Sequence, residues 1–195
     1  VDDGIFAPFL TWPYTTAGTF APFDLMGADT LSVEVHLMVQ NPKDVGSAFA
    51  RAGAHAIIGH VEAFENVREI RSALNLWRES GASEAGVGVL MQTDISSLDS
   101  LVPFCDFVHF MSIPRIGVQG IPYDAEAPAR IAEFHDRHPG LTISVDGGVN
   151  LENIEDLVRA GATRFGVGSA IIKTENPGTA YEALKSLAEA TVGSA

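Results

Sequence analysis

LTISVDGGV (141–149), LENIEDLVRAGA (151–162) and RFGVGSA (164–170) are the three consecutive stretches that decide the fold. The first and third are short, largely apolar runs, and apolar residues recur at helical spacing in the stretch between them. A strand that leads through a helix into a second apolar strand is the repeating unit of a parallel sheet. These stretches therefore predict a β-α-β unit near the C-terminus.

The same alternation extends back toward the N-terminus. Four more apolar runs precede this unit, each followed by a helical or short helical stretch: LSVEVHLMV (31–39), HAIIGHVEA (55–63), EAGVGVLMQ (84–92) and DFVHFMSI (106–113). Six strand–helix units without a change in composition predict one α/β domain spanning residues 1–195. An open doubly wound sheet would usually carry G-x-G-x-x-G after its first strand, and no strand here is followed by it. A (β/α)₈ TIM barrel is therefore favoured, and a terminal helix is expected over 179–190.

Composition limits the classes of partner. Asp and Glu outnumber Lys and Arg by 25 to 12, so the formal net charge of −13 would repel nucleic acid and an anionic membrane surface. The uncharged stretch 4–23 contains three prolines and predicts a loop, not a membrane helix. The lone Cys105 fits a small buried residue in a reducing compartment, so we expect a soluble cytoplasmic protein.

Polar residues follow the predicted strands where a barrel of this type carries its chemistry, at the carboxyl ends. His36 and Asp146 are the strongest candidates, because an imidazole or a carboxylate in an apolar run is costly unless it is paired or binds a metal. Each also has a structural interpretation: His36 as a hydrogen-bonded core histidine, and Asp146 as a turn-forming residue before glycine.

The remaining polar or sulfur-containing residues at these strand ends favour structural roles. His60 and His109 are interpreted as core histidines, Met38 and Met111 as core packing, and Glu62 as a solvated charge.

Glycines after the last two strands predict a phosphate site. Gly147-Gly148 and Gly168-Ser169 would expose backbone N–H groups beside helix starts, and such groups hold phosphate oxygens without a positive side chain. The loops after the last two strands of a (β/α)₈ barrel frequently form this kind of site.

Six segments in order along the chain carry a family resemblance: VDDGIFAPFLT (1–11), HLMVQNP (36–42), HVEA (60–63), MSIPRIGVQ (111–119), VDGGVN (145–150) and GSAI (168–171). Over essentially its whole length the sequence resembles the ribulose-phosphate 3-epimerase family. That resemblance implies a (β/α)₈ barrel that interconverts ribulose 5-phosphate and xylulose 5-phosphate, or a closely related phosphorylated ketose. The proton transfer at C3 would pass through an enediolate stabilised by a divalent metal ion, for which Zn²⁺, Mn²⁺ and Fe²⁺ are equally suitable.

The resemblance also assigns roles by position. His36 and Asp146 match metal ligands, and Asp146 also matches a residue that exchanges a proton with substrate. The substrate pocket would be lined by His36, Met38, Met111, Arg115, Ile116, Gly117 and Val118, the last four forming the loop that covers the substrate. The phosphate cradle would consist of Gly147, Gly148, Gly168 and Ser169.

The family's second acid/base aspartate and a further metal-binding histidine would both precede Val1. The first β/α unit and most of strand 2 would then also lie outside the numbered chain. One hypothesis is that the natural chain extends upstream and carries them. The other is that the chain begins at Val1, that a partner chain completes the barrel, and that Asp2 replaces the missing acid.

Two other functions remain open. A related phosphate-binding barrel could catalyse decarboxylation or aldol cleavage, although those reactions usually need an active-site lysine. Lys43, Lys173 and Lys185 all lie beyond strand ends or on helices. A catalytically impaired barrel could instead bind sugar phosphates or serve assembly. Arg115 and Val118 stand where the family has glycines, so the substrate could differ, and we expect the protein to self-associate as family members commonly do.

Overall fold

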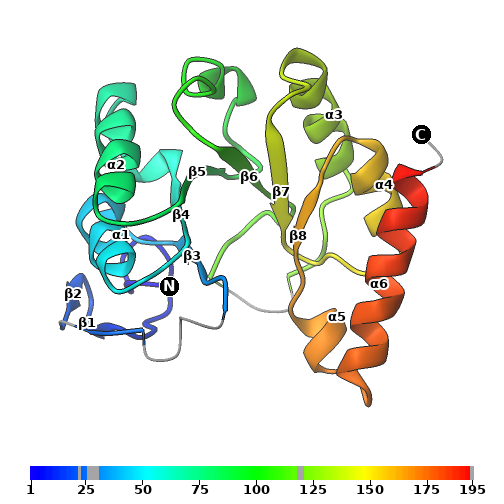
Figure 1. Ribbon diagram of the computed structural model, residues 1–195, viewed down its shortest axis with the longest axis horizontal. Coiled ribbons are helices and arrows are strands. Elements are labelled where there is room, and N and C mark those ends of the chain that lie inside the picture. Colours follow the sequence, from blue (N-terminus) through cyan, green and yellow to red (C-terminus); the bar gives the residue numbers. More distant parts are fainter. Residues whose placement is uncertain (22, 26–30, 118–120, 194–195) are drawn as a thin grey trace.

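The computed structural model describes residues 1–21, 23–25, 31–117 and 121–193, and its centre is a parallel sheet that curves into half of a barrel (Figure 1). Among the described residues the sheet has six strands in the order β3-β4-β5-β6-β7-β8. Their bounds are β3 Glu34–Leu37, β4 Ala56–His60, β5 Glu84–Val89, β6 Phe107–Met111, β7 Thr142–Asp146 and β8 Arg164–Gly166. Consecutive strands are neighbours throughout, as in a (β/α)₈ barrel.

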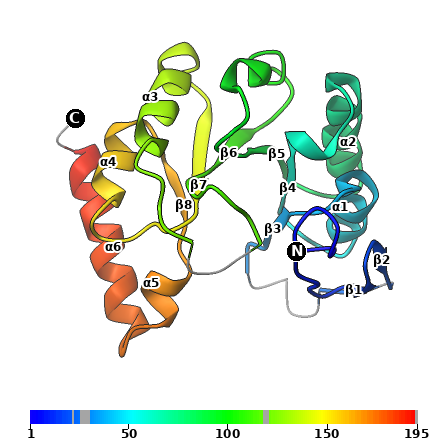
Figure 2. The same cartoon turned by 180° about the vertical axis from the view of Figure 1, so that it is seen from behind.

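Helices stand outside the curved sheet, as both views show (Figure 1, Figure 2). They are α1 Pro42–Arg51, α2 Val67–Glu79, α3 Ala127–Arg137, α4 Ile154–Arg159, α5 Ser169–Ile172 and α6 Pro177–Val192. Two short 3₁₀ turns cover Val61–Ala63 and Ile95–Leu98, and a small hairpin pairs β1 Tyr14–Thr16 with β2 Thr19–Phe20.

The sequence of α2 explains how the helices are held. Asn66 caps the helix by accepting a 3.1 Å hydrogen bond from the Glu69 amide, and the buried side chains Ile70, Ala73, Leu74 and Trp77 follow at helical spacing. The Trp77 indole donates a hydrogen bond of 3.0 Å to the Lys43 carbonyl on α1. The main core therefore lies between the helices and the outer face of the sheet.

The inner face of the sheet carries a different set of side chains. Ala56, Ile58 and Phe107 form a small buried apolar cluster there. Arg164 on β8 lies over the Phe107 ring, with its guanidinium carbon 4.6 Å from the centroid. It also pairs with Glu84 at 2.9 Å and with Glu34 on β3 at 3.2 Å. The first and last strands of the sheet are therefore joined through one arginine, which is possible only because the sheet is strongly curved.

The predicted order of elements is confirmed, but every strand is shorter than its apolar run. The run 55–63 ends as a strand at His60 and continues as a 3₁₀ turn, and the run 164–170 ends at Gly166 before α5. The short helix expected over 96–104 is a 3₁₀ turn at Ile95–Leu98. Apolar residues continue beyond the strands because the following turns still pack against the core.

The N-terminal residues lie beside the sheet. Asp2 forms a parallel bridge with Met38, and the Met38 amide donates a 2.8 Å hydrogen bond to the Val1 carbonyl. This agrees with the prediction that VDDG resembles the end of a strand. Cys105 is buried, and burial raises the pKa of its thiol to about 12, which confirms a structural role. Within the described ranges, no helix is long and apolar enough to cross a membrane.

Gly59 on β4 provides a test of the packing between the sheet and the helices. An added Cβ at Gly59 would lie 2.7 Å from Trp77 Cη2 and 3.2 Å from Pro42 Cβ, so we expect Gly59→Ala to lower the free energy of unfolding by about 1–3 kcal/mol. Urea denaturation measures this change. Gly140→Ala is the control, because a Cβ there meets no atom within 4 Å and should change stability by less than about 0.5 kcal/mol.

Candidate metal and active site

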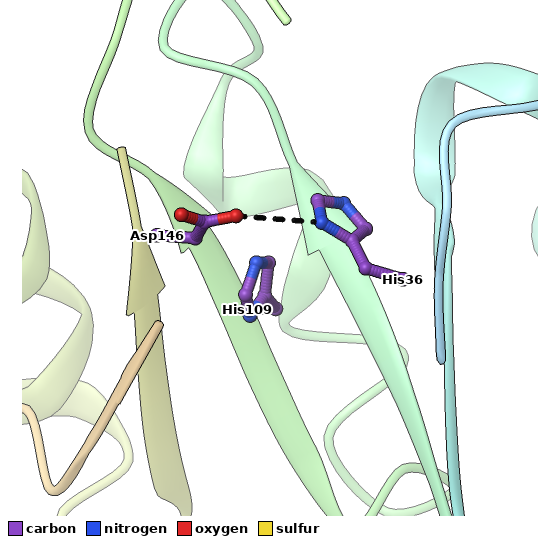
Figure 3. Close-up of side chains that lie close together, drawn as sticks. All are labelled: His36, His109 and Asp146. Atoms are coloured by element: carbon purple, nitrogen blue, oxygen red, sulfur yellow. Dashed lines mark ion pairs between the residues drawn. The ribbon is translucent and has the colours of Figure 1, made fainter. Parts of the chain in front are cut away.

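Side chains from three strands converge on the inner face of the sheet near the carboxyl ends of its strands (Figure 3). They are His36 from β3, His109 from β6 and Asp146 from β7, and their candidate ligand atoms all lie within 4.8 Å of one another. His36 Nδ1 is 3.7 Å from Asp146 Oδ2, the contact marked by the dashed line. Two of these residues were predicted from the sequence, and the third was not.

His109 has one nitrogen engaged and one free. Its Nδ1 lies 2.9 Å from the Ser144 hydroxyl on β7, which is its register partner in the sheet. Its Nε2 is buried and has no hydrogen-bond partner among the described residues. A buried polar atom without a partner costs free energy, so its position beside His36 and Asp146 favours a role as a ligand.

His36 is also held by a chain of polar contacts on its other side. His36 Nε2 lies 2.7 Å from His60 Nε2, and His60 Nδ1 lies 3.3 Å from Glu62 Oε2. The other carboxylate oxygen of Glu62 accepts hydrogen bonds from the Leu90 amide at 2.9 Å and from the Thr93 hydroxyl. Glu62 is therefore bound within the structure, and its interpretation as a solvated charge is wrong.

Burial sets the charge of these groups. It lowers the pKa of His36 and of His109 well below 6.5, and neighbouring imidazoles lower both further. Both rings are therefore neutral at pH 7, the form in which histidine binds metals. Burial alone would raise the pKa of Glu62, but the hydrogen bonds from His60, Thr93 and Leu90 lower it overall, so this carboxylate is ionised.

The three side chains fit a divalent cation. Nitrogen and oxygen ligands that each lie about 2.0–2.2 Å from a tetrahedral ion are roughly 3.4 Å apart, close to the 3.7 Å between His36 and Asp146. Two neutral imidazoles and one carboxylate suit Zn²⁺, Mn²⁺ or Fe²⁺, and this donor set does not choose among them.

Asp146 is positioned so that it can also reach a substrate. Its side chain is 41% exposed, whereas His36 is 15% exposed, so the carboxylate faces the opening of the site. Gly166 on β8 leaves the necessary room, because an added Cβ there would lie 3.3 Å from Asp146 Oδ1. The Ser112 hydroxyl and amide both donate to the Asp146 carbonyl, at 3.0 and 2.8 Å, which fixes the backbone of this residue.

The predicted substrate-binding residues surround this cluster only in part. Met111 is buried and is the register partner of Asp146, so both side chains face the inside of the sheet. Met38 is half-buried beside Asp2. Ile116 and Gly117 are half-buried and Arg115 is exposed, while Val118 lies outside the described residues.

The loop that contains Gly117 packs onto the N-terminal segment. An added Cβ at Gly117, whose φ is +70°, would lie 2.8 Å from Ala7 Cβ and 3.4 Å from Asp2 Oδ1. This oxygen of Asp2 is buried without a partner in the part of the chain that the structure describes, and burial raises the pKa of Asp2. Asp2 is not one of the three side chains that converge on the candidate metal site.

The predicted phosphate-binding residues lie at the ends of β7 and β8. Gly147 and Gly148 have φ values of +118° and +70°, which strongly favour glycine. A Cβ at Gly168 would meet no atom within 4 Å, and Ser169 is exposed. The two glycine segments therefore present accessible backbone next to the side of the site where Asp146 lies.

Sequence reasoning missed His60, His109 and Glu62 as parts of the site. The available signal was register: His60 and His109 occupy inward positions of β4 and β6, each ending or nearly ending its strand. Taken one at a time, each resembles a core histidine, and only their convergence on His36 shows otherwise.

Solved structures with the same architecture are TIM-barrel enzymes. The "KGPDC" of Streptococcus mutans, solved in complex with D-ribose 5-phosphate, superposes with a TM-score of 0.64 at 14% identity, covering 77% of this chain and 68% of that one. 3-Keto-L-gulonate-6-phosphate decarboxylase of Vibrio cholerae gives 0.63 at 17% identity, covering 82% and 73%. At these identities the likeness shows the fold alone, and the fold is that of a TIM-barrel enzyme.

Sequence comparison identifies the family within that fold. The model of the ribulose-phosphate 3 epimerase family matches residues 1–172. Ribulose-phosphate 3-epimerase of Aquifex aeolicus is 34% identical over 190 residues, covering 96% of this chain and 82% of that protein. The enzyme of Mycobacterium leprae is 31% identical over 188 residues, covering 95% and 80%. The chain belongs to the ribulose-phosphate 3-epimerase family and is an isomerase of that type.

The lowered pKa of His109 predicts how stability depends on pH in metal-free protein. In the unfolded chain this ring titrates near pH 6.5, whereas in the folded protein it stays neutral to well below that pH. Below about pH 6.5 the unfolded state therefore binds more protons, and the unfolding free energy falls by about 1.4 kcal/mol per pH unit for this group. Urea denaturation between pH 5 and 6.5 should show a smaller slope in His109→Leu, and equal slopes would contradict the assignment.

Proposed function

We propose that this protein is a metal-dependent epimerase that inverts C3 of a phosphorylated ketose by proton transfer through an enediolate. One observation carries the proposal: His36, His109 and Asp146 converge on the inner face at the carboxyl ends of the strands, in a chain of this family. TIM-barrel enzymes place their catalytic groups at this face.

The proposed substrates are ribulose 5-phosphate and xylulose 5-phosphate. Support comes from the names of the relatives, which cover most of their own length and this chain's. The structure of the Streptococcus mutans protein in complex with D-ribose 5-phosphate is consistent with a sugar phosphate as ligand in this fold. A closely related ketose phosphate would require the same two ends of the site, a cation end and a phosphate end.

The proposed cation ligands are His36, His109 and Asp146. A divalent cation at this position would offset the negative charge that develops on the two substrate oxygens when the C3 proton leaves. His36 contributes Nδ1, which faces Asp146, and His109 contributes the buried Nε2 that has no partner among the described residues. This choice of His109 goes beyond the residues predicted from the sequence.

Asp146 is the proposed residue that moves the proton. Its carboxylate is the most exposed of the three, so one oxygen can face the cation while the other reaches C3 of the substrate. The hydrogen bonds that Ser112 donates to the Asp146 and Gly147 carbonyls keep the strand end rigid. A fixed backbone limits the carboxylate to small side-chain movements, as proton exchange at one carbon requires.

The phosphate end of the substrate is proposed to bind the backbone of Gly147, Gly148 and Gly168 and the hydroxyl of Ser169. Positive φ at two of these glycines and open space at the third support close approach of an anion to the backbone. Arg115, Ile116 and Gly117 are the described residues of the proposed covering loop, with Met38 and Met111 lining the pocket beneath it. We also keep a cytoplasmic location and self-association as proposals.

The proposed reaction has a direct test in D₂O. We expect incubation with ribulose 5-phosphate to give xylulose 5-phosphate with deuterium at C3, because the proton removed from C3 exchanges with solvent before a new one is delivered. Asp146→Asn should lower the rate by roughly 10²–10⁴-fold while the fold is retained. Mass spectrometry and ¹H NMR of the products measure both.

Asp136→Asn, at an exposed position on α3, is the matched control and should keep its activity. A cleaved or decarboxylated product would favour the related lyases, and an absence of any product would favour a barrel that only binds sugar phosphates. Near-normal turnover in Asp146→Asn would exclude this residue from the proton transfer.

Removal of metal tests the cation separately. Treatment with a chelator followed by desalting should abolish turnover, and addition of Zn²⁺, Mn²⁺ or Fe²⁺ should restore it, with the effective ion identifying the native metal. The same treatment should leave the far-UV circular dichroism spectrum unchanged, because the sheet and the helices are held by the apolar core. Full activity in protein shown by elemental analysis to be metal-free would overturn metal dependence.

A further inference from the structure

His60 is enclosed on all sides, and both of its ring nitrogens are engaged. Its side chain is fully buried, with Phe6 at 5.6 Å between ring centroids. Gly88 on the neighbouring strand has no side chain, and a Cβ there would lie 3.2 Å from the His60 ring. This packing holds the ring in one orientation, with Nδ1 toward Glu62 and Nε2 toward His36.

The hydrogen bonds around Glu62 give this chain a direction. An ionised carboxylate can only accept, and one oxygen already accepts from the Leu90 amide and the Thr93 hydroxyl. The other oxygen faces His60 Nδ1, which must therefore carry the hydrogen. In a neutral ring His60 Nε2 is then an acceptor, so His36 Nε2 carries the hydrogen that joins the two rings.

The consequence falls on the far side of His36. With the hydrogen on Nε2, the neutral His36 ring has a bare lone pair on Nδ1, the nitrogen that lies 3.7 Å from Asp146 Oδ2. We propose that Glu62 is a positioning residue that acts through His60 to fix this tautomer of His36, so that Nδ1 is always available to a divalent cation. The inference rests on the proposed function, in which His36 is a cation ligand, and adds the residues that prepare it.

Glu62→Gln tests the direction of the chain without changing its shape. The Leu90 and Thr93 donors hold the carbonyl oxygen of the amide on their side, so the NH₂ group faces His60 Nδ1. His60 Nδ1 must then accept, its Nε2 must donate, and His36 Nε2 must accept. The hydrogen of His36 moves to Nδ1, where it blocks the lone pair that faces Asp146.

Two measurements follow this change. In metal-free protein labelled with ¹⁵N-histidine, long-range ¹H–¹⁵N NMR should show His36 protonated on Nε2 in wild type and on Nδ1 in Glu62→Gln. The signals are assigned by loss in a His36→Gln variant. Titration of metal-free protein with Zn²⁺ against a chromophoric chelator should show about 10–100-fold weaker binding by Glu62→Gln, the effect typical of residues that orient metal-binding histidines.

Glu62→Ala separates this role from simple packing. If Glu62 only filled space, the isosteric Gln variant would bind Zn²⁺ as wild type does, and the Ala variant would be the weaker of the two. Under the proposal the order is reversed, because Ala merely releases the tautomer of His36 whereas Gln enforces the wrong one. Glu65→Gln, at an exposed position three residues away, is the control and should match wild type. If Glu62→Gln does not fold, mixed His36 tautomers in Glu62→Ala still support the proposal, and an unchanged Nε2–H tautomer overturns it.

The outcomes distinguish this inference from the proposed function. Wild-type protein that binds Zn²⁺ with the same affinity as Glu62→Gln overturns the inference and leaves the proposed function intact. Wild-type protein that binds no Zn²⁺ overturns the metal dependence, and the inference with it. A wild-type His36 that carries its hydrogen on Nδ1 overturns the inference whatever the affinity.

Discussion

Curvature of the parallel sheet is the constraint on which the site depends. β3 and β7 are four strands apart in the sheet order, so in a flat sheet they would lie roughly 19 Å apart, at about 4.8 Å per strand. Instead His36 Nδ1 and Asp146 Oδ2 are 3.7 Å apart. Small inward residues make the curvature possible, because Gly86 leaves room for the Phe107 ring and Gly166 for the Asp146 carboxylate. Arg164 then joins β8 to Glu34 on β3 across the interior.

Water exclusion gives the polar groups of the site their properties. His60 and His109 lie in the curve of the sheet, where an unpartnered nitrogen is costly and a charged ring more so. Their contacts therefore become directional: Ser144 engages one side of His109, and Glu62 engages one side of His60. Asp146 is different, because it stands at the open end of the site. The arrangement places prepared ligands inside and a mobile proton carrier at the entrance.

The fold by itself does not define the reaction. Barrels with TM-scores of 0.64 and 0.63 include a decarboxylase, and their low sequence identity leaves only the architecture in common. What separates this chain from them is the set of side chains at the strand ends, which its relatives at 34% and 31% identity share by family. In folds of this kind the scaffold is general, and the chemistry follows from a few residues that it brings together.

The sequence alone determined the order of strands and helices, because buried parallel strands are continuous apolar runs and the helices between them are amphipathic. It also identified His36 and Asp146, which stand in motifs that persist along the chain. It overestimated strand lengths, since apolar residues continue into turns such as Val61–Ala63. Only the tertiary structure decided that His109, His60 and Glu62 belong to the site. A histidine in an apolar strand has the same local pattern whether it faces a hydroxyl or another imidazole, and that choice depends on strands distant in sequence that the curved sheet brings within hydrogen-bond reach.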